Sequence, residues 1–135
     1  MQNHARKTHD RSGVAATEFA VCLPIIVVII VGTIEACSMI YLKQTLSVAA
    51  YEGVRASLKP GATATEVADA CNRVLTARNT QGATITITPS NFSSQAAETW
   101  ITVDIAAPGG ANSVMSGWFY DSLSVTGSAT MMKEY

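Results

Sequence analysis

The chain has 135 residues, a formal net charge of −1 and a charged fraction of only 14%. This composition provides no strongly basic surface, so nucleic acid is not an expected partner. When an apolar segment and a basic leader are set aside, about 90 residues remain, which suffices for a small core but not for a large catalytic cleft. The length therefore predicts one small domain at most.

The N-terminal third contains an apolar run preceded by basic residues. From Phe19 to Ile34 there are sixteen residues without a charge, and extending the run back to Val14 adds one acid, Glu18. This length predicts a transmembrane helix over about residues 14–35. The basic side chains before the run favour a cytoplasmic N-terminus and an exported C-terminal part; they are Arg6, Lys7 and Arg11.

The helical pattern continues beyond the apolar run. Leu42, Leu46, Ala49 and Gly53 recur at helical spacing, and no strong breaker other than Pro24 precedes Pro60-Gly61. We therefore predict one helix over residues 14–58, kinked at Pro24 because proline removes a backbone hydrogen bond. Glu35 is interpreted as an interfacial acid at the far edge of the membrane.

A second, shorter helix is predicted next. Thr63 and Glu66 have the spacing of a capping box, and apolar residues follow with the stripe of an amphipathic helix that ends near Asn79: Val67, Ala70, Cys71, Val74 and Leu75. Asp69 and Arg73 are spaced to form an ion pair on the solvent side.

The remainder of the chain alternates as strands do. Segments 84–88, 100–105 and 123–131 predict three strands, separated by a polar loop at 90–98 and a turn at 108–110; residues 114–120 fit either a short helix or a buried loop. The predicted fold class is α+β, with a long N-terminal helix, a short helix and a small antiparallel sheet of about three strands.

The sequence contains few patterns typical of catalytic, metal-binding or cofactor-binding sites. The two histidines, His4 and His9, lie before the apolar run, and the sequence contains no HExxH, CxxC or phosphate-binding glycine loop. We therefore expect no enzymatic activity, no cofactor and no metal. Cys22, Cys37 and Cys71 are interpreted as small buried hydrophobic residues, with an intermolecular disulfide through Cys71 as the alternative.

A motif at the start of the apolar run resembles a known family. Gly13 is followed by Val14, small residues, Glu18-Phe19 and Leu23-Pro24, with a second acid at Glu35 and the sequence EGVRA at 52–56. This pattern resembles the N-terminal signature of TadE-like minor pilins of the Tad (Flp-type) pilus, a relative of type IV pili. The resemblance covers about residues 12–57.

The resemblance implies a route from precursor to filament. A prepilin peptidase would cut between Gly13 and Val14, dividing the chain into a cytoplasmic leader (1–13), the long helix (14–58) and a periplasmic or extracellular head (59–135). Glu18 and Phe19 would serve assembly, with Glu18 setting the axial register beside a Val14 amine. The implied location is the bacterial inner membrane, single-pass, and after assembly the extracellular pilus. The implied partners are the membrane, the peptidase, other pilin and minor pilin subunits and an inner-membrane assembly platform, and the implied roles are pilus biogenesis, adhesion or secretion.

Two other interpretations of the apolar run remain open. One is a permanently membrane-anchored scaffold of an envelope complex that never enters a filament. The other is a secreted binding domain released by signal peptidase, although no convincing cleavage site follows the run. The mature N-terminus discriminates among the three.

Overall fold

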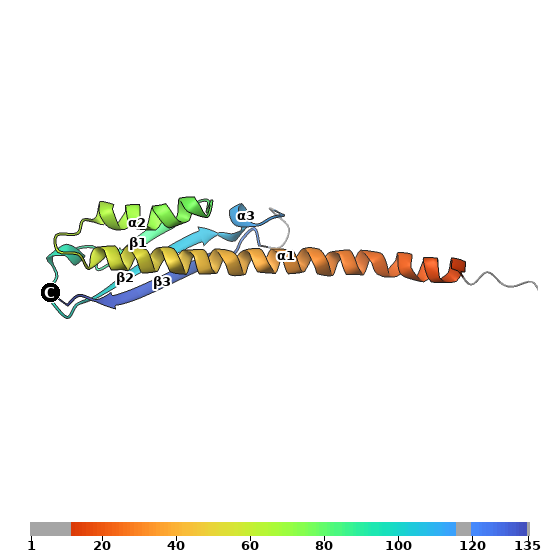
Figure 1. Ribbon diagram of the computed structural model, residues 1–135, viewed down its shortest axis with the longest axis horizontal. Coiled ribbons are helices and arrows are strands. Elements are labelled where there is room, and N and C mark those ends of the chain that lie inside the picture. The colour runs from red at the N-terminus through yellow and green to blue at the C-terminus, as the bar shows by residue number, and fades with distance from the viewer. Residues whose placement is uncertain (1–11, 116–119, 135) are drawn as a thin grey trace, which may run out of the picture. The chain divides into compact units, whose positions relative to one another are not determined.

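The computed structural model describes residues 12–115 and 120–134, and its elements follow the predicted order (Figure 1). They are α1 (Ser12–Ser57), α2 (Ala64–Ala77), β1 (Thr84–Thr88), the 3-10 helix η1 (Phe92–Ser94), β2 (Trp100–Pro108), α3 (Gly109–Asn112) and β3 (Ser124–Met132). A long apolar helix, a shorter helix and a three-stranded antiparallel sheet confirm the predicted α+β class.

The chain forms two compact units, Met1–Ile34 and Glu35–Tyr135, and α1 contributes to both. In the first unit every described residue is helical, and the large apolar side chains are exposed; Val21, for example, is 73% exposed. Within the described residues, α1 is the one helix long and apolar enough to cross a membrane. Exposure of this kind suits a helix whose surroundings are lipid or other apolar helices.

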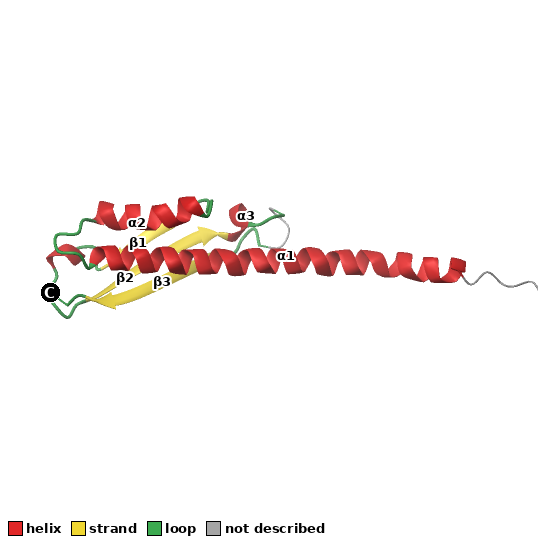
Figure 2. Cartoon of the chain, viewed as in Figure 1, coloured by secondary structure: helices red, strands yellow, loops and turns green. Residues whose placement is uncertain are grey.

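In the second unit, the later part of α1 and the whole of α2 cover one face of the sheet (Figure 2). The predicted apolar face of α1 is buried, with Leu46, Ala49 and Val54 each 0% exposed. Gly53 lies on this face, and a Cβ built there would stand 2.4 Å from the Cys71 sulfur and 3.3 Å from Val103. The absence of a side chain at Gly53 therefore lets α1 approach both α2 and β2.

The N-terminus of α2 has the predicted capping box. The backbone N–H of Thr63 donates to the Glu66 carboxylate at 2.9 Å, and the backbone N–H of Glu66 donates to the Thr63 hydroxyl at 3.3 Å. These hydrogen bonds satisfy donors that a helix start leaves without intrahelical partners. The backbone hydrogen bond from Thr63 is the main cause that lowers the pKa of Glu66.

The sheet has the order β1-β2-β3, and both pairings are antiparallel. On the inner face, Ile101, Val103 and Ile105 are fully buried, as their alternation predicts. The outer face carries rows of polar residues across the three strands, one of them Thr86, Asp104 and Ser128. The hydroxyls of Thr102 and Thr130 lie 2.9 Å apart in the next row. Such division into an apolar and a polar face is typical of a sheet covered on one side.

Several details differ from the sequence prediction. Strand β2 extends to Pro108, and Gly109 and Gly110 begin the short helix α3 where a turn was expected. The supposedly polar loop 90–98 contains η1, whose Phe92 is only 2% exposed and belongs to the core. The segment 114–120, predicted as a helix or a buried loop, is described only at 114–115 and 120, where it is neither helix nor strand.

Candidate functional site: the N-terminal helix

The predicted processing site lies in the first turn of α1. Gly13 has open space around it, and the Val14 side chain is 59% exposed. The Thr17 hydroxyl donates hydrogen bonds to the carbonyls of Gly13 (3.1 Å) and Val14 (2.8 Å). The peptide bond between Gly13 and Val14 is therefore accessible but helical, and an extended backbone at this bond requires the first turn to unwind.

The predicted assembly residues follow within one further turn. Glu18 is exposed, and Phe19 is 62% exposed. Val14 and Glu18 are four residues apart in the helix, so their side chains lie on the same face. The structure thus places the residue that would carry a new amine after cleavage and the lone acid of the apolar run one turn apart.

The predicted kink residue, Pro24, lies inside α1, which is helical on both sides of it. Proline has no backbone N–H, so the carbonyl of Ala20 lacks its usual intrahelical donor. No strand, loop or break accompanies the proline within the described helix. A kink at this point remains a prediction.

Glu35 has a different environment from the one expected of an interfacial acid. It is only 1% exposed, and its Oε1 accepts a hydrogen bond from the backbone N–H of Met115. Its Oε2 is buried and has no hydrogen-bond partner among the described residues. The sequence pattern did not reveal this role because the two partners are 80 residues apart.

The three cysteines are free thiols that differ in exposure. Cys71 is buried, as predicted, and burial raises its pKa to about 11. Cys22 and Cys37 are exposed in this chain, so their predicted burial is wrong. Both cysteines lie on α1, and within the unit of each no other described element covers its side chain. The exposed Cys37 is therefore better placed than the buried Cys71 to form an intermolecular disulfide.

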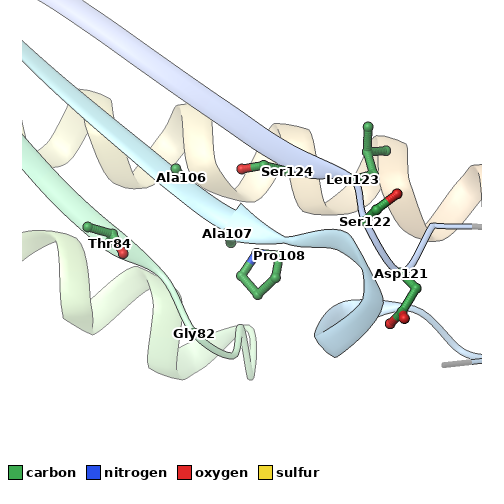
Figure 3. Close-up of a pocket in the computed structure, with 9 residues that line it drawn as sticks. All are labelled: Gly82, Thr84, Ala106, Ala107, Pro108, Asp121, Ser122, Leu123 and Ser124. Atoms are coloured by element: carbon green, nitrogen blue, oxygen red, sulfur yellow. The ribbon is translucent and has the colours of Figure 1, made fainter. Parts of the chain in front are cut away.

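A shallow hollow lies at one end of the sheet (Figure 3). Thr84 of β1, Pro108 of β2 and Asp121 of the loop before β3 contribute to its lining. Among the described residues, Asp121 is the single charged one that lines it. Across the described residues, no group of three or more His, Cys, Asp or Glu side chains is placed to hold a metal ion.

An exposed apolar N-terminal helix that continues into a small α+β unit is consistent in length and composition with a membrane-anchored chain. Residues 13–55 match the family model described as TadE-like protein, which confirms the resemblance seen in the sequence. The matched segment begins at the glycine of the motif and ends two residues before the end of α1. No curated protein and no solved structure matches the chain. The family match supports a pilin-like role associated with Tad pili, and the apolar helix fits membrane anchoring.

Proposed function

We propose that this chain is a minor pilin or pseudopilin of a Tad-type pilus, made as a membrane precursor, cut between Gly13 and Val14 and assembled through α1. The observation that carries the proposal is the coincidence of the TadE-like match, residues 13–55, with the helix α1. The role is structural, in pilus biogenesis, adhesion or secretion, with no catalysis by this chain. Its partners are the prepilin peptidase, other pilin subunits and an inner-membrane assembly platform.

The apolar part of α1 supports a membrane-bound precursor. Its side chains are exposed along the whole circumference of the helix, as in a segment that contacts lipid on every side. The basic residues of the leader favour retention of the N-terminus in the cytoplasm, and the head is then periplasmic.

Cleavage changes the charge at this end of the chain. Residues 1–13 carry three basic side chains and one acid, so their removal takes the formal side-chain charge from −1 to −3. The loss of Arg6, Lys7 and Arg11 removes the basic side chains that hold the N-terminus in the cytoplasm. Withdrawal of the helix from the membrane then becomes easier. Because Gly13 and Val14 belong to the first turn, where helices fray readily, the cost of unwinding the substrate for the peptidase is small.

Cleavage also creates a partner for Glu18. The new amine at Val14 is positively charged and lies one helical turn from Glu18, or meets the Glu18 of a neighbouring subunit. A buried carboxylate is stabilised by a nearby cation, and a buried polar pair is a well-attested way to fix register. Glu18 thereby sets the axial offset between packed helices, and the adjoining Phe19 packs between them.

Mass spectrometry of the mature N-terminus tests the proposal, with and without the candidate peptidase. Val14 as the first residue supports it, whereas an intact Met1 in purified filaments or membranes contradicts it and favours the permanently anchored scaffold. A start downstream of the apolar run favours the secreted domain.

A matched pair of variants sharpens this test. Gly13→Leu should block cleavage, because the residue before the cut must be held closely by the peptidase. Gly32→Leu is the control, since Gly32 lies in the same helix and has equally open surroundings. Equal cleavage of both variants contradicts the assignment of Gly13.

A further inference from the structure

The helical layer of the second unit has a groove between α1 and α2. From α1 it is lined by Val48, Glu52, Arg55 and Ala56, with Lys59 just after the helix, and from α2 by Ala70, Arg73, Val74 and Ala77, with Arg78 just after the helix. We name this the α1–α2 groove. Its lining includes four cations and one acid, above a floor of small apolar side chains.

The cations of the groove are exposed. Arg55, Lys59 and Arg73 are exposed, and no ion pair is found for them within the described residues, including the pair predicted between Asp69 and Arg73. Arg78 donates to the Thr45 hydroxyl at 3.5 Å, and its guanidinium stands 5.4 Å from the centre of the Tyr41 ring. These contacts engage Arg78 but leave its charge without a carboxylate.

On the other side of the same unit, the outer face of the three described strands carries a single charged residue, the acid Asp104, which lies exposed in the middle of that face. Trp100 lies on that face as well, four residues earlier in β2, and is 62% exposed. An exposed tryptophan on this face is typical of a contact surface, because large aromatic side chains are concentrated at interfaces.

We propose that the α1–α2 groove of one copy receives the outer sheet face of a second copy, with Asp104 against Arg73 and Trp100 over the apolar floor. The opposite charges of Asp104 and the groove cations, together with the exposed Trp100, carry the proposal. The two surfaces lie on opposite layers of one unit, so the contact is head-to-tail and can be repeated from copy to copy. The inference rests on the proposed assembly of this chain with further copies, but it does not depend on cleavage.

Other anions fit the groove less well. The groove begins near Val48, about 20 Å along α1 beyond Glu35. The uncharged run has ended by that point, so lipid head groups are not the natural occupant. A soluble polyanion would bind the cations of the groove without contacting its apolar floor. The Trp100 side chain of a second copy, in contrast, would pack on that floor.

The test is cross-linking between two differently tagged copies of the full chain, co-expressed in membranes. A photo-reactive residue replaces Ala77 in the groove, and Thr65, exposed on α2 outside the groove, is the control position. We expect cross-links from position 77 to the outer face of β2 in the other copy and few from position 65. Cross-links from position 77 only to lipid or to other proteins overturn the inference, as does their absence.

Charge reversal gives a second, independent measurement. Arg73→Glu in the copy that carries the cross-linker should reduce the yield about five-fold, and Asp104→Arg in the other copy should restore it. Asp121→Arg is the control, because it changes the net charge equally but lies in the loop before β3. If Asp104→Arg and Asp121→Arg both restore the cross-linking yield, or if neither restores it, the proposed pairing of Asp104 with Arg73 is overturned.

Failure of this contact is distinguishable from failure of the proposed function. The mature N-terminus is measured in the same samples. Chains that start at Val14 and enter filaments without the position-77 cross-link overturn only the contact between heads. Uncut chains that still cross-link overturn only the processing.

Discussion

The backbone N–H of Met115 donates a hydrogen bond to Oε1 of Glu35, joining the segment after α3 to α1 across 80 residues of sequence. Glu35 is the first charged residue after the apolar run, and it is also the first residue of the second compact unit. The carboxylate therefore does more than end a hydrophobic segment. It holds the backbone at Met115, just after α3, against α1.

Replacing Glu35 tests this connection. Glu35→Ala leaves the Met115 N–H without its partner and creates a cavity, so we expect a loss of about 2 kcal/mol in the free energy of unfolding. Glu35→Gln keeps an acceptor oxygen and should lose less. Thermal unfolding in detergent measures both, with the exposed Glu134→Ala as control. Equal stability of Glu35→Ala and the control contradicts a structural role for the hydrogen bond.

Gly53 should tolerate no side chain. In Gly53→Ala the new Cβ would approach the Cys71 sulfur and Val103, and we expect a destabilisation of about 1–3 kcal/mol from overpacking. Gly32→Ala, in the same helix with open surroundings, should not destabilise. Denaturant unfolding compares the two variants. A second change, Cys71→Ala, should recover part of the loss, because it removes the atom in conflict.

The capping box gives the stability of the head a pH dependence. Glu66 has its pKa lowered by the hydrogen bonds from Thr63, so the folded state favours the carboxylate. This contribution is present above the ordinary value of 4.5 and is lost as pH falls through the lowered pKa of the folded state. Unfolding midpoints across this acidic range should fall less in Glu66→Gln than in the parent chain. Parallel pH profiles contradict the prediction.

The sequence alone predicts those structural features that depend on residues close together in the chain. The bounds of β1 follow from strict alternation ended by Pro89, and the start of α2 follows from the Thr63 and Glu66 spacing. The family motif likewise lies within one continuous helix, so its resemblance was detectable without a fold.

Features made by distant segments were not predictable in this way. Phe92 is buried only because the surrounding loop packs on the core, and the burial of Glu35 requires a partner 80 residues away. The cations of the α1–α2 groove appear in the sequence as scattered solvent-facing residues. Arg55 and Arg73 line one groove only once α1 and α2 are packed together.

The thiols should differ in reactivity according to their exposure. At pH 8 the buried Cys71, with its pKa raised to about 11, has far less thiolate than an ordinary cysteine and is also shielded. Exposed Cys37 should therefore be alkylated readily in the folded chain, and Cys71 only after denaturation. Peptide mapping with a maleimide probe measures both sites. Rapid alkylation of Cys71 in the native chain contradicts the burial.

The role proposed for Glu18 separates membrane insertion from assembly. A carboxylate in an apolar helix hinders insertion, by up to about 3 kcal/mol near a bilayer centre and less near an end, so Glu18→Ala should insert at least as well as the parent chain. Incorporation into filaments should fall strongly, because the Val14 amine then lacks its carboxylate. Membrane fractionation and filament shearing measure the two steps, with Val21→Ala, at an exposed position of the same apolar run, as the control. Normal incorporation of Glu18→Ala removes the register role and leaves Glu18 as an acid near a helix end, where the helix dipole alone would favour it.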